Sequence, residues 1–295
     1  MRHDLLTEQQ NPSSQSIDSL AIADVLRVIN SADAQVAQAV ESEIPNISRA
    51  VEAIVDRLQH GGNLFYIGAG TSGRLGVLDA SECVPTFQVP RELVQGIIAG
   101  GDGALRRSSE RAEDDPEQSK VDLLQRGFES KDALVGIAAS GRTPYVLGAL
   151  ALGRSLGAVT IGLSCVHNSE VAAASDIAIT PTPGPEIITG STRMRAGTAT
   201  KLVLNMLSTG AMIRLGYVYG NLMVNVQPTN TKLADRARRI IAQIAGVSYD
   251  EASRLLAESG SVRTAIVMHK LKLGRTEAED RLAQAQGRLR IALGE

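Results

Sequence analysis

The chain has 295 residues, of which 43% are hydrophobic and 21% charged, and its formal net charge is -2. This composition is typical of a folded globular protein and excludes a disordered polar chain. The small net charge, the lack of Trp and the presence of only 5 Tyr and 3 Phe give no basis for nucleic-acid binding.

The sequence contains no apolar run of about 18 residues, and its first residues lack the apolar region of a signal peptide. We therefore expect a cytoplasmic protein with no membrane contact. Cys83 and Cys165 lie far apart, without Cys-x-x-Cys spacing or a matching histidine cluster. We expect both to be reduced, packed residues, and we expect no metal site.

Residues 1–54 are expected to form an N-terminal arm followed by helices. The polar stretch 7–14 is compatible with an extended arm that packs on the protein and equally with a frayed terminus. Beyond it, Ile44, Ile47, Val51 and Ile54 recur at helical spacing, and the glycines after His60 end that helix.

Short apolar runs then alternate with helical stretches. Strands are expected at 64–67, 93–99, 133–138, 159–163 and 177–180, and helices near 73–81, 103–113, 117–127, 144–156 and 169–174. Such alternation predicts an α/β fold with a doubly wound parallel sheet. We place this domain at residues 55–218.

A loop rich in glycine and hydroxyl groups follows the first predicted strand. Its central residues are Gly70, Thr71, Ser72 and Gly73. A strand, loop and helix in this order direct backbone N–H groups and the positive end of a helix at one point, which favours a phosphate group. The glycines also satisfy the G-x-G-x-x-G spacing of dinucleotide sites, but Asp102 lies well beyond the position about 20 residues on that such a site needs.

A second loop of this kind follows the third predicted strand. It contains Ser140, Gly141, Arg142 and Thr143, and Pro144 suits the first turn of the next helix. Because ligands of open α/β sheets bind at the carboxyl ends of strands, both loops are expected to hold one phosphate, with Arg142 either as a charged partner or facing solvent.

A long apolar helix is expected to end at Gly216, and residues 219–295 are expected to form a small helical bundle. The helix is apolar nearly all round, which predicts burial by the sheet and by a second subunit. We therefore expect a homodimer.

Two carboxylates stand near the predicted phosphate loops, at Glu82 and Glu113. By composition each is either a solvated side chain or a catalytic group, and spacing alone does not distinguish the two. Glu186 and Ser191 follow the last predicted strand.

Long contiguous strings identify a resemblance. The sequence resembles the N-acetylmuramic acid 6-phosphate etherases in Gly68-Ala69-Gly70-Thr71-Ser72-Gly73-Arg74-Leu75-Gly76, Leu78-Asp79-Ala80-Ser81-Glu82-Cys83, Ile137-Ala138-Ala139-Ser140-Gly141-Arg142-Thr143-Pro144-Tyr145 and Gly184-Pro185-Glu186-Ile187-Ile188-Thr189-Gly190-Ser191-Thr192-Arg193-Met194. That family belongs to the sugar isomerase (SIS) superfamily and is similar to the animal glucokinase regulatory proteins. The resemblance covers nearly the whole chain.

The resemblance implies a dimeric lyase that cleaves the lactyl ether of N-acetylmuramic acid 6-phosphate in cell-wall recycling, without metal or organic cofactor. The products are N-acetylglucosamine 6-phosphate and D-lactate, formed by elimination across sugar carbons 2 and 3 and then addition of water. The two glutamates of the family correspond to Glu82 and Glu113. We assign Glu82 as the acid for lactate departure and then the base for water, and Glu113 as the base at carbon 2, with the reverse assignment open.

In this family the stretch that contains Glu186 and Ser191 reaches the sugar, although a structural turn explains these residues equally well. The sequence departs from the family at Arg195, where Lys is usual, and at Asn225, where an acidic residue is common. A non-catalytic sugar-phosphate sensor and a phosphosugar isomerase on the same fold remain alternatives, because a fold alone does not fix function.

Overall fold

A computed structural model describes residues 6–107 and 110–295. The expectation that the first residues do not form a signal peptide partly concerns residues outside these ranges. The chain forms two compact units. The first comprises residues Met1–Ser81 and Arg91–Ser208, and the second comprises Glu82–Pro90 and Thr209–Glu295. The division expected at residues 54 and 218 stays a prediction.

The first unit is built on a parallel five-stranded sheet. Its strands are β1 (Leu64–Gly68), β2 (Val94–Ile98), β3 (Ala133–Ile137), β4 (Val159–Leu163) and β5 (Ile177–Ile179). Their order is β2-β1-β3-β4-β5, and every neighbouring pair is parallel. The five predicted strands and the doubly wound class are confirmed.

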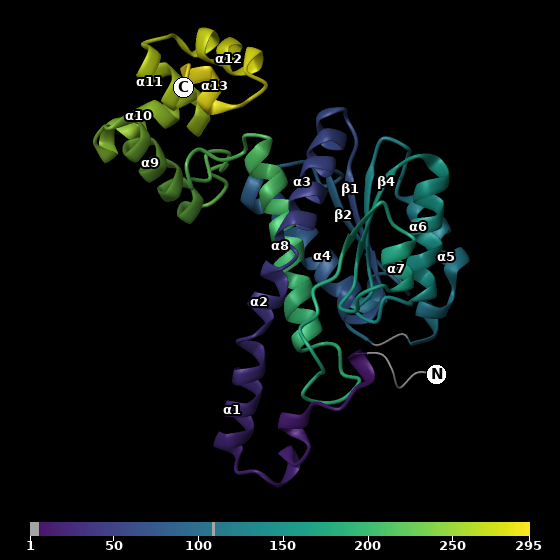
Figure 1. The fold of residues 1–295 in the computed structure, drawn as a ribbon. Coiled ribbons are helices and arrows are strands. Elements are labelled where there is room, and N and C mark those ends of the chain that lie inside the picture. The colour runs from purple at the N-terminus through teal and green to yellow at the C-terminus, as the bar shows by residue number, and fades with distance from the viewer. Residues whose placement is uncertain (1–5, 108–109) are drawn as a thin grey trace. The chain divides into compact units, whose positions relative to one another are not determined.

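Helices cover both faces of this sheet (Figure 1). On one side lie α5 (Pro116–Gln125), α6 (Pro144–Leu156) and α7 (Glu170–Ala173), and on the other lie α3 (Ile44–Gln59), α4 (Gly70–Phe87) and α8 (Arg195–Arg214). Phe65 and Ile67 of β1 are buried in the cluster that includes α6. On the α4 side, Gly96 of β2 lies so close to the backbone of Val77 that a methyl group would not fit.

Two contacts fix the helices on which the loops depend. The Tyr145 hydroxyl of α6 donates to Asp122 of α5 at 2.5 Å, and burial and this carboxylate raise the pKa of the phenol. On the opposite side, Asn205 of α8 donates to Asp79 of α4 at 2.6 Å.

The prediction of a helix over 103–113 is wrong. The described residues of this stretch form two short 3-10 helices, Asp102–Leu105 and Glu110–Asp114. The first is held by Arg74, whose guanidinium donates to the carbonyl oxygens of Ala104 and Leu105 at 2.7 and 3.2 Å. These carbonyls are therefore satisfied by a side chain of α4.

The N-terminal segment is a packed arm from residue 6 onward. Three short 3-10 helices, Leu6–Glu8, Pro12–Ser14 and Ile17–Ser19, precede α1 (Ile22–Asp33) and α2 (Val36–Glu41). Thr7, Asn11 and Ser14 are buried, which favours the arm over a frayed terminus. In Figure 1, α1 projects from the rest of this unit.

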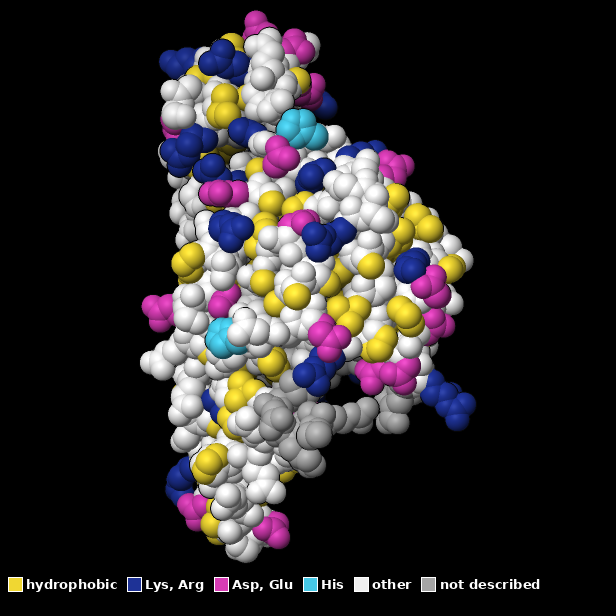
Figure 2. Space-filling view, turned by 45° about the vertical axis from the view of Figure 1, so that its right-hand side comes forward, with side chains coloured by type: hydrophobic (Ala, Val, Ile, Leu, Met, Phe, Trp, Pro, Cys, Tyr) yellow, Lys and Arg dark blue, Asp and Glu magenta, His cyan; other side chains and the backbone are white. Residues whose placement is uncertain are grey.

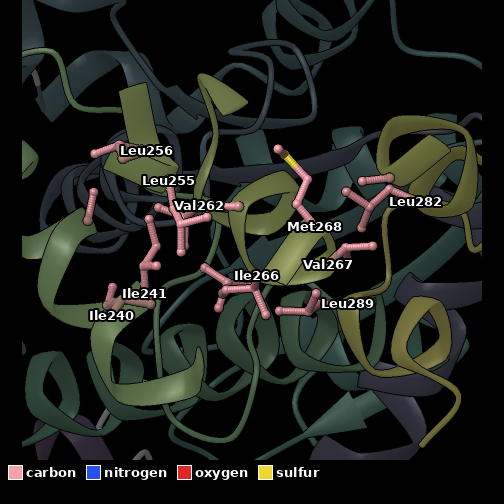
Figure 3. Close-up of a cluster of buried hydrophobic side chains, with 14 of the residues drawn as sticks. Ile240, Ile241, Leu255, Leu256, Val262, Ile266, Val267, Met268, Leu282 and Leu289 are labelled. Atoms are coloured by element: carbon pink, nitrogen blue, oxygen red, sulfur yellow. The ribbon is translucent and has the colours of Figure 1, made fainter. Parts of the chain in front are cut away.

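The second unit contains the predicted C-terminal helical bundle. Its helices are α9 (Thr231–Ala245), α10 (Tyr249–Ser259), α11 (Val262–Leu271), α12 (Arg275–Gln284) and α13 (Leu289–Leu293). Ile241, Leu255, Ile266 and Leu289 meet in its apolar core (Figure 3). Asn225 donates to the carbonyl of Phe87 at 2.8 Å, a bond that the acidic residue common in the family would not make.

The distribution of charged side chains and the length of the helices bear on membrane and polyanion binding. On the face drawn in Figure 2, basic and acidic side chains are interspersed. Among the residues that the structure describes, no helix combines the length and apolar character that crossing a bilayer requires.

Candidate functional site

The loop after β1 turns directly into α4. The helix begins at Gly70, three residues earlier than predicted, so Thr71, Ser72 and Gly73 all lie in its first turn. Gly73 packs against the end of β1, since a methyl group on it would lie 2.5 Å from the carbonyl oxygen of Gly68, and its N–H donates to the carbonyl of Ala69. The two hydroxyls are half-buried beside the N–H groups at the start of the helix.

The loop after β3 has the same design. Gly141 has a φ of +71° and packs against Ser169, leaving no room for a side chain. Thr143 occupies the N-cap of α6 without using its side chain there, so no capping bond engages its hydroxyl. Ser140 is half-buried, and Arg142 lies at the surface 3.5 Å from Glu170.

The two loops start side by side in the sheet. Gly68 at the end of β1 is in register with Ile137 at the end of β3. The strand β2 lies on the other side of β1, so the chain order reverses between β1 and β3. This is the switch point at which doubly wound sheets bind ligands, and both predicted loops follow the strands that flank it.

A third segment reaches the first loop from far along the chain. A methyl group on Gly197, in the first turn of α8, would lie 3.5 Å from the Thr71 side chain and 3.6 Å from the carbonyl oxygen of Thr192. The start of α8 therefore borders the loop after β1. The sequence held no signal for this contact, because no spacing rule links positions so far apart.

Glu186 caps α8. The carboxylate is 1% exposed and accepts from the backbone N–H groups of Arg195 and Ala196, each at 2.9 Å. A carboxylate is favourable at the positive end of a helix. These contacts favour the structural explanation for Glu186, whereas Ser191 lies half-buried in the turn that follows.

Glu113 lies on an exposed turn held against α6. Ala112 packs against the core around α6, and Asp115 caps α5 by accepting from the N–H groups of Glu117 and Gln118. The carbonyl of Pro116 approaches Gly148 so closely that no methyl group would fit between them. The turn that carries Glu113 is thus fixed to the helix that begins at the second loop.

Glu82 lies in α4, the helix that starts at the first loop, and its side chain is exposed. It falls in the stretch of this helix that clusters with the second unit. Its catalytic role stays a prediction.

Arg195, the departure from the family pattern, is buried with 4% of its surface exposed. Its guanidinium donates to the carbonyl of Pro185 and to Gln35 Oε1, each at 3.1 Å. Burial lowers its pKa, while the carboxylates of Glu186 and Asp33 act in the opposite direction.

Both cysteines are free thiols and buried, as expected. Burial and the charge of Glu186 raise the pKa of Cys165 to about 12, whereas a hydrogen bond from Thr200 opposes the shift. Among the described residues, no group of three or more His, Cys, Asp or Glu side chains is arranged to hold a metal ion.

Thiol labelling tests this description. At pH 8, below the pKa of Cys165, the folded protein is expected to react with a thiol-specific chromogenic reagent far more slowly than the protein unfolded in denaturant, since the thiolate is the reactive form. Equal reaction rates in the two states would contradict the burial of both thiols.

Comparisons with known proteins give a consistent result. A family model described as the glucokinase regulatory protein N-terminal SIS domain matches residues 46–154. An N-acetylmuramic acid 6-phosphate etherase from Rhodopirellula baltica is 54% identical over 97% of this chain and 95% of its own. One from Pasteurella multocida is 50% identical over 99% of this chain and 97% of its own.

Two solved structures share the fold. A putative phosphosugar isomerase from Bacteroides fragilis is 20% identical with a TM-score of 0.51, covering 66% of this chain and 91% of its own. A phosphoheptose isomerase from Neisseria gonorrhoeae is 16% identical with a TM-score of 0.50, covering 65% of this chain and 98% of its own. At these identities the likeness concerns the fold alone.

Proposed function

The chain belongs to the N-acetylmuramic acid 6-phosphate etherase family, and we propose that Glu82 and Glu113 carry out the family's reaction on a substrate held by the two hydroxyl-rich loops. The reaction cleaves the D-lactyl ether of N-acetylmuramic acid 6-phosphate, so the protein is a carbon–oxygen lyase. It serves cell-wall recycling and yields N-acetylglucosamine 6-phosphate and D-lactate. The observation that carries this function is about 50% identity to etherases over almost the full chain.

The 6-phosphate of the substrate binds at the start of α4 and α6. The hydroxyl groups of Thr71, Ser72, Ser140 and Thr143 donate hydrogen bonds to it, and the backbone at Gly70, Gly73 and Gly141 lets it approach closely. The adjacent ends of β1 and β3 support this assignment, since both loops leave the sheet at its switch point. Arg142 adds a positive charge after it exchanges Glu170 for the phosphate.

The carboxylates act on the ring-opened sugar. Glu113 removes the proton at carbon 2, where the aldehyde at carbon 1 delocalises the developing charge. Glu82 protonates the ether oxygen as D-lactate departs and then takes a proton from the water that adds at carbon 3. The fixed turn around Ala112 and Asp115 supports the role of Glu113, and the matching string Leu78-Asp79-Ala80-Ser81-Glu82-Cys83 supports that of Glu82.

The alternative of a non-catalytic sugar-phosphate sensor is not favoured by relatives that are etherases along nearly their whole length. The same assay tests the isomerase alternative, because an isomerase would not release D-lactate. The purified protein is expected to release D-lactate from N-acetylmuramic acid 6-phosphate, not from the unphosphorylated sugar, and equally with or without EDTA. Binding of the phosphorylated substrate without release of D-lactate would contradict the proposed function.

The working form is a homodimer in the cytoplasm, where a charged sugar phosphate is retained. The apolar face of α1 supports the dimer, because Ile22 is 72% and Leu26 59% exposed, one helical turn apart. A second copy of the chain would cover this face.

Leu26→Lys tests the interface. Because a charge in an apolar interface is costly to bury, the variant is expected to elute as a monomer in size-exclusion chromatography with light scattering, whereas the unmodified chain elutes as a dimer. Leu124→Lys, on the exposed side of α5, serves as control and is expected to leave the mass unchanged. A dimeric Leu26→Lys variant would exclude this face as the interface.

A further inference from the structure

The N-terminal arm is hydrogen-bonded to the segment between β5 and α8. The Asn11 side-chain amide donates to the carbonyl of Pro185 at 3.0 Å, and the Ser14 hydroxyl donates to that of Ile187 at 2.8 Å. The N–H of Gly190 donates to the carbonyl of Thr7 at 3.2 Å. The arm thus holds residues 185–190 through two buried side chains and one backbone carbonyl.

Arg195, at the start of α8, holds the same loop. It donates to the carbonyl of Pro185, which therefore accepts from both Asn11 and Arg195, and it also donates to Gln35 at the start of α2. A methyl group on the neighbouring Gly184 would lie 3.0 Å from the guanidinium. A buried guanidinium that donates to a backbone carbonyl holds that carbonyl in place, so the loop has little freedom to move.

The loop held in this way is linked through α8 to the loop after β1. Glu186 connects it to the first turn of α8 through the N–H groups of Arg195 and Ala196. The next residue, Gly197, borders Thr71 in the phosphate loop. A displacement at Pro185 is therefore transmitted through Glu186 and α8 to the place where the phosphate binds.

We infer that Arg195 and Asn11 are positioning residues for the etherase reaction, because together they hold Pro185 and thereby the α8 side of the phosphate loop. Their hydrogen-bond partners are protein groups: Asn11 donates to Pro185, and Arg195 donates to Pro185 and Gln35. This inference rests on the proposed function for its substrate. It assigns the N-terminal arm a role in positioning the segments that border the substrate.

Steady-state kinetics of Arg195→Met test the inference. A misplacement of about 1 Å caused by a distant substitution can cost about a hundredfold in rate, so kcat/KM is expected to fall about tenfold to a hundredfold, with weaker binding of N-acetylglucosamine 6-phosphate in calorimetry. Arg195→Lys keeps a donor for the carbonyl of Pro185 and is expected to stay within about threefold of the unmodified protein. Arg49→Met, on an exposed position of α3, is the matched control and is expected to change nothing.

A second variant approaches the same carbonyl from the arm. Asn11→Ala is expected to lower kcat/KM in the same direction, and the double variant is expected to lose less than the product of the two effects, because both act through Pro185. If Arg195→Met fails to fold, two results test the inference: a lower kcat/KM in Asn11→Ala, and a kcat/KM in Arg195→Lys that stays close to that of the unmodified protein.

Unchanged kcat/KM and sugar-phosphate binding in both Arg195→Met and Asn11→Ala would overturn the inference. So would two effects that multiply independently, since they would not share one loop. An unmodified protein that releases no D-lactate would instead contradict the proposed function, and the calorimetric arm would still test positioning through the affinity for N-acetylglucosamine 6-phosphate.

Discussion

Glu82→Gln is expected to slow D-lactate release sharply while the proton at carbon 2 still exchanges with deuterated solvent. Glutamine keeps the shape of the side chain but has no proton to give to the departing ether oxygen. A positioned proton transfer typically contributes about 10²–10⁴-fold in rate, so the loss is expected in that range. Exchange at carbon 2 is followed by mass spectrometry of the recovered substrate.

Glu113→Gln is expected to lose both the exchange and the release, because without the base at carbon 2 no later step can begin. Glu117→Gln is the matched control, since Glu117 lies on neighbouring α5 and pairs with Lys120 at the surface. If Glu82→Gln loses the exchange and Glu113→Gln keeps it, the two roles are reversed. Full activity in both variants would remove these glutamates from the mechanism.

Gly73→Ala is expected to remove phosphate-dependent binding. A methyl group at this position would lie 2.5 Å from the carbonyl oxygen of Gly68 and 2.7 Å from the Ile98 side chain. The first turn of α4 must then move away from the end of β1, and with it Thr71 and Ser72. We expect the affinity for N-acetylglucosamine 6-phosphate, measured by calorimetry, to fall at least about a hundredfold.

Gly103→Ala is the control for this substitution, since a methyl group there meets open space. It is expected to bind as the unmodified chain does. Circular dichroism establishes that each variant is folded before its affinity is compared. A folded Gly73→Ala protein with unchanged affinity would show that the phosphate binds elsewhere.

The sheet and the loops could be predicted from the sequence because their causes are local. β1 and β3 are short, fully buried runs, and each is followed by a hydroxyl-bearing loop: Thr71 lies in the first turn of the helix after β1, and Ser140 lies just before the helix that begins at Pro144. The helix expected over 103–113 failed because a side chain from elsewhere, Arg74, satisfies the carbonyls of Ala104 and Leu105. Helical propensity does not register such a partner.

The surroundings of the loops could not be predicted, because they depend on contacts between distant parts of the chain. The contact between Gly197 and Thr71 and the hydrogen bond from Asn11 to Pro185 join segments that no periodicity connects. Arg195 was recognised as a departure from the family, yet only its burial against Pro185 and Gln35 indicates what the cation does.

The route of the oxygen atom from water tests the reaction most directly. In ¹⁸O-labelled water, elimination followed by hydration predicts ¹⁸O at carbon 3 of N-acetylglucosamine 6-phosphate, located by the isotope shift in ¹³C NMR, and none in D-lactate. The lactate keeps the original ether oxygen because the bond that breaks is the one to carbon 3. Label in D-lactate, with none at carbon 3, would contradict the elimination that Glu82 and Glu113 are proposed to perform.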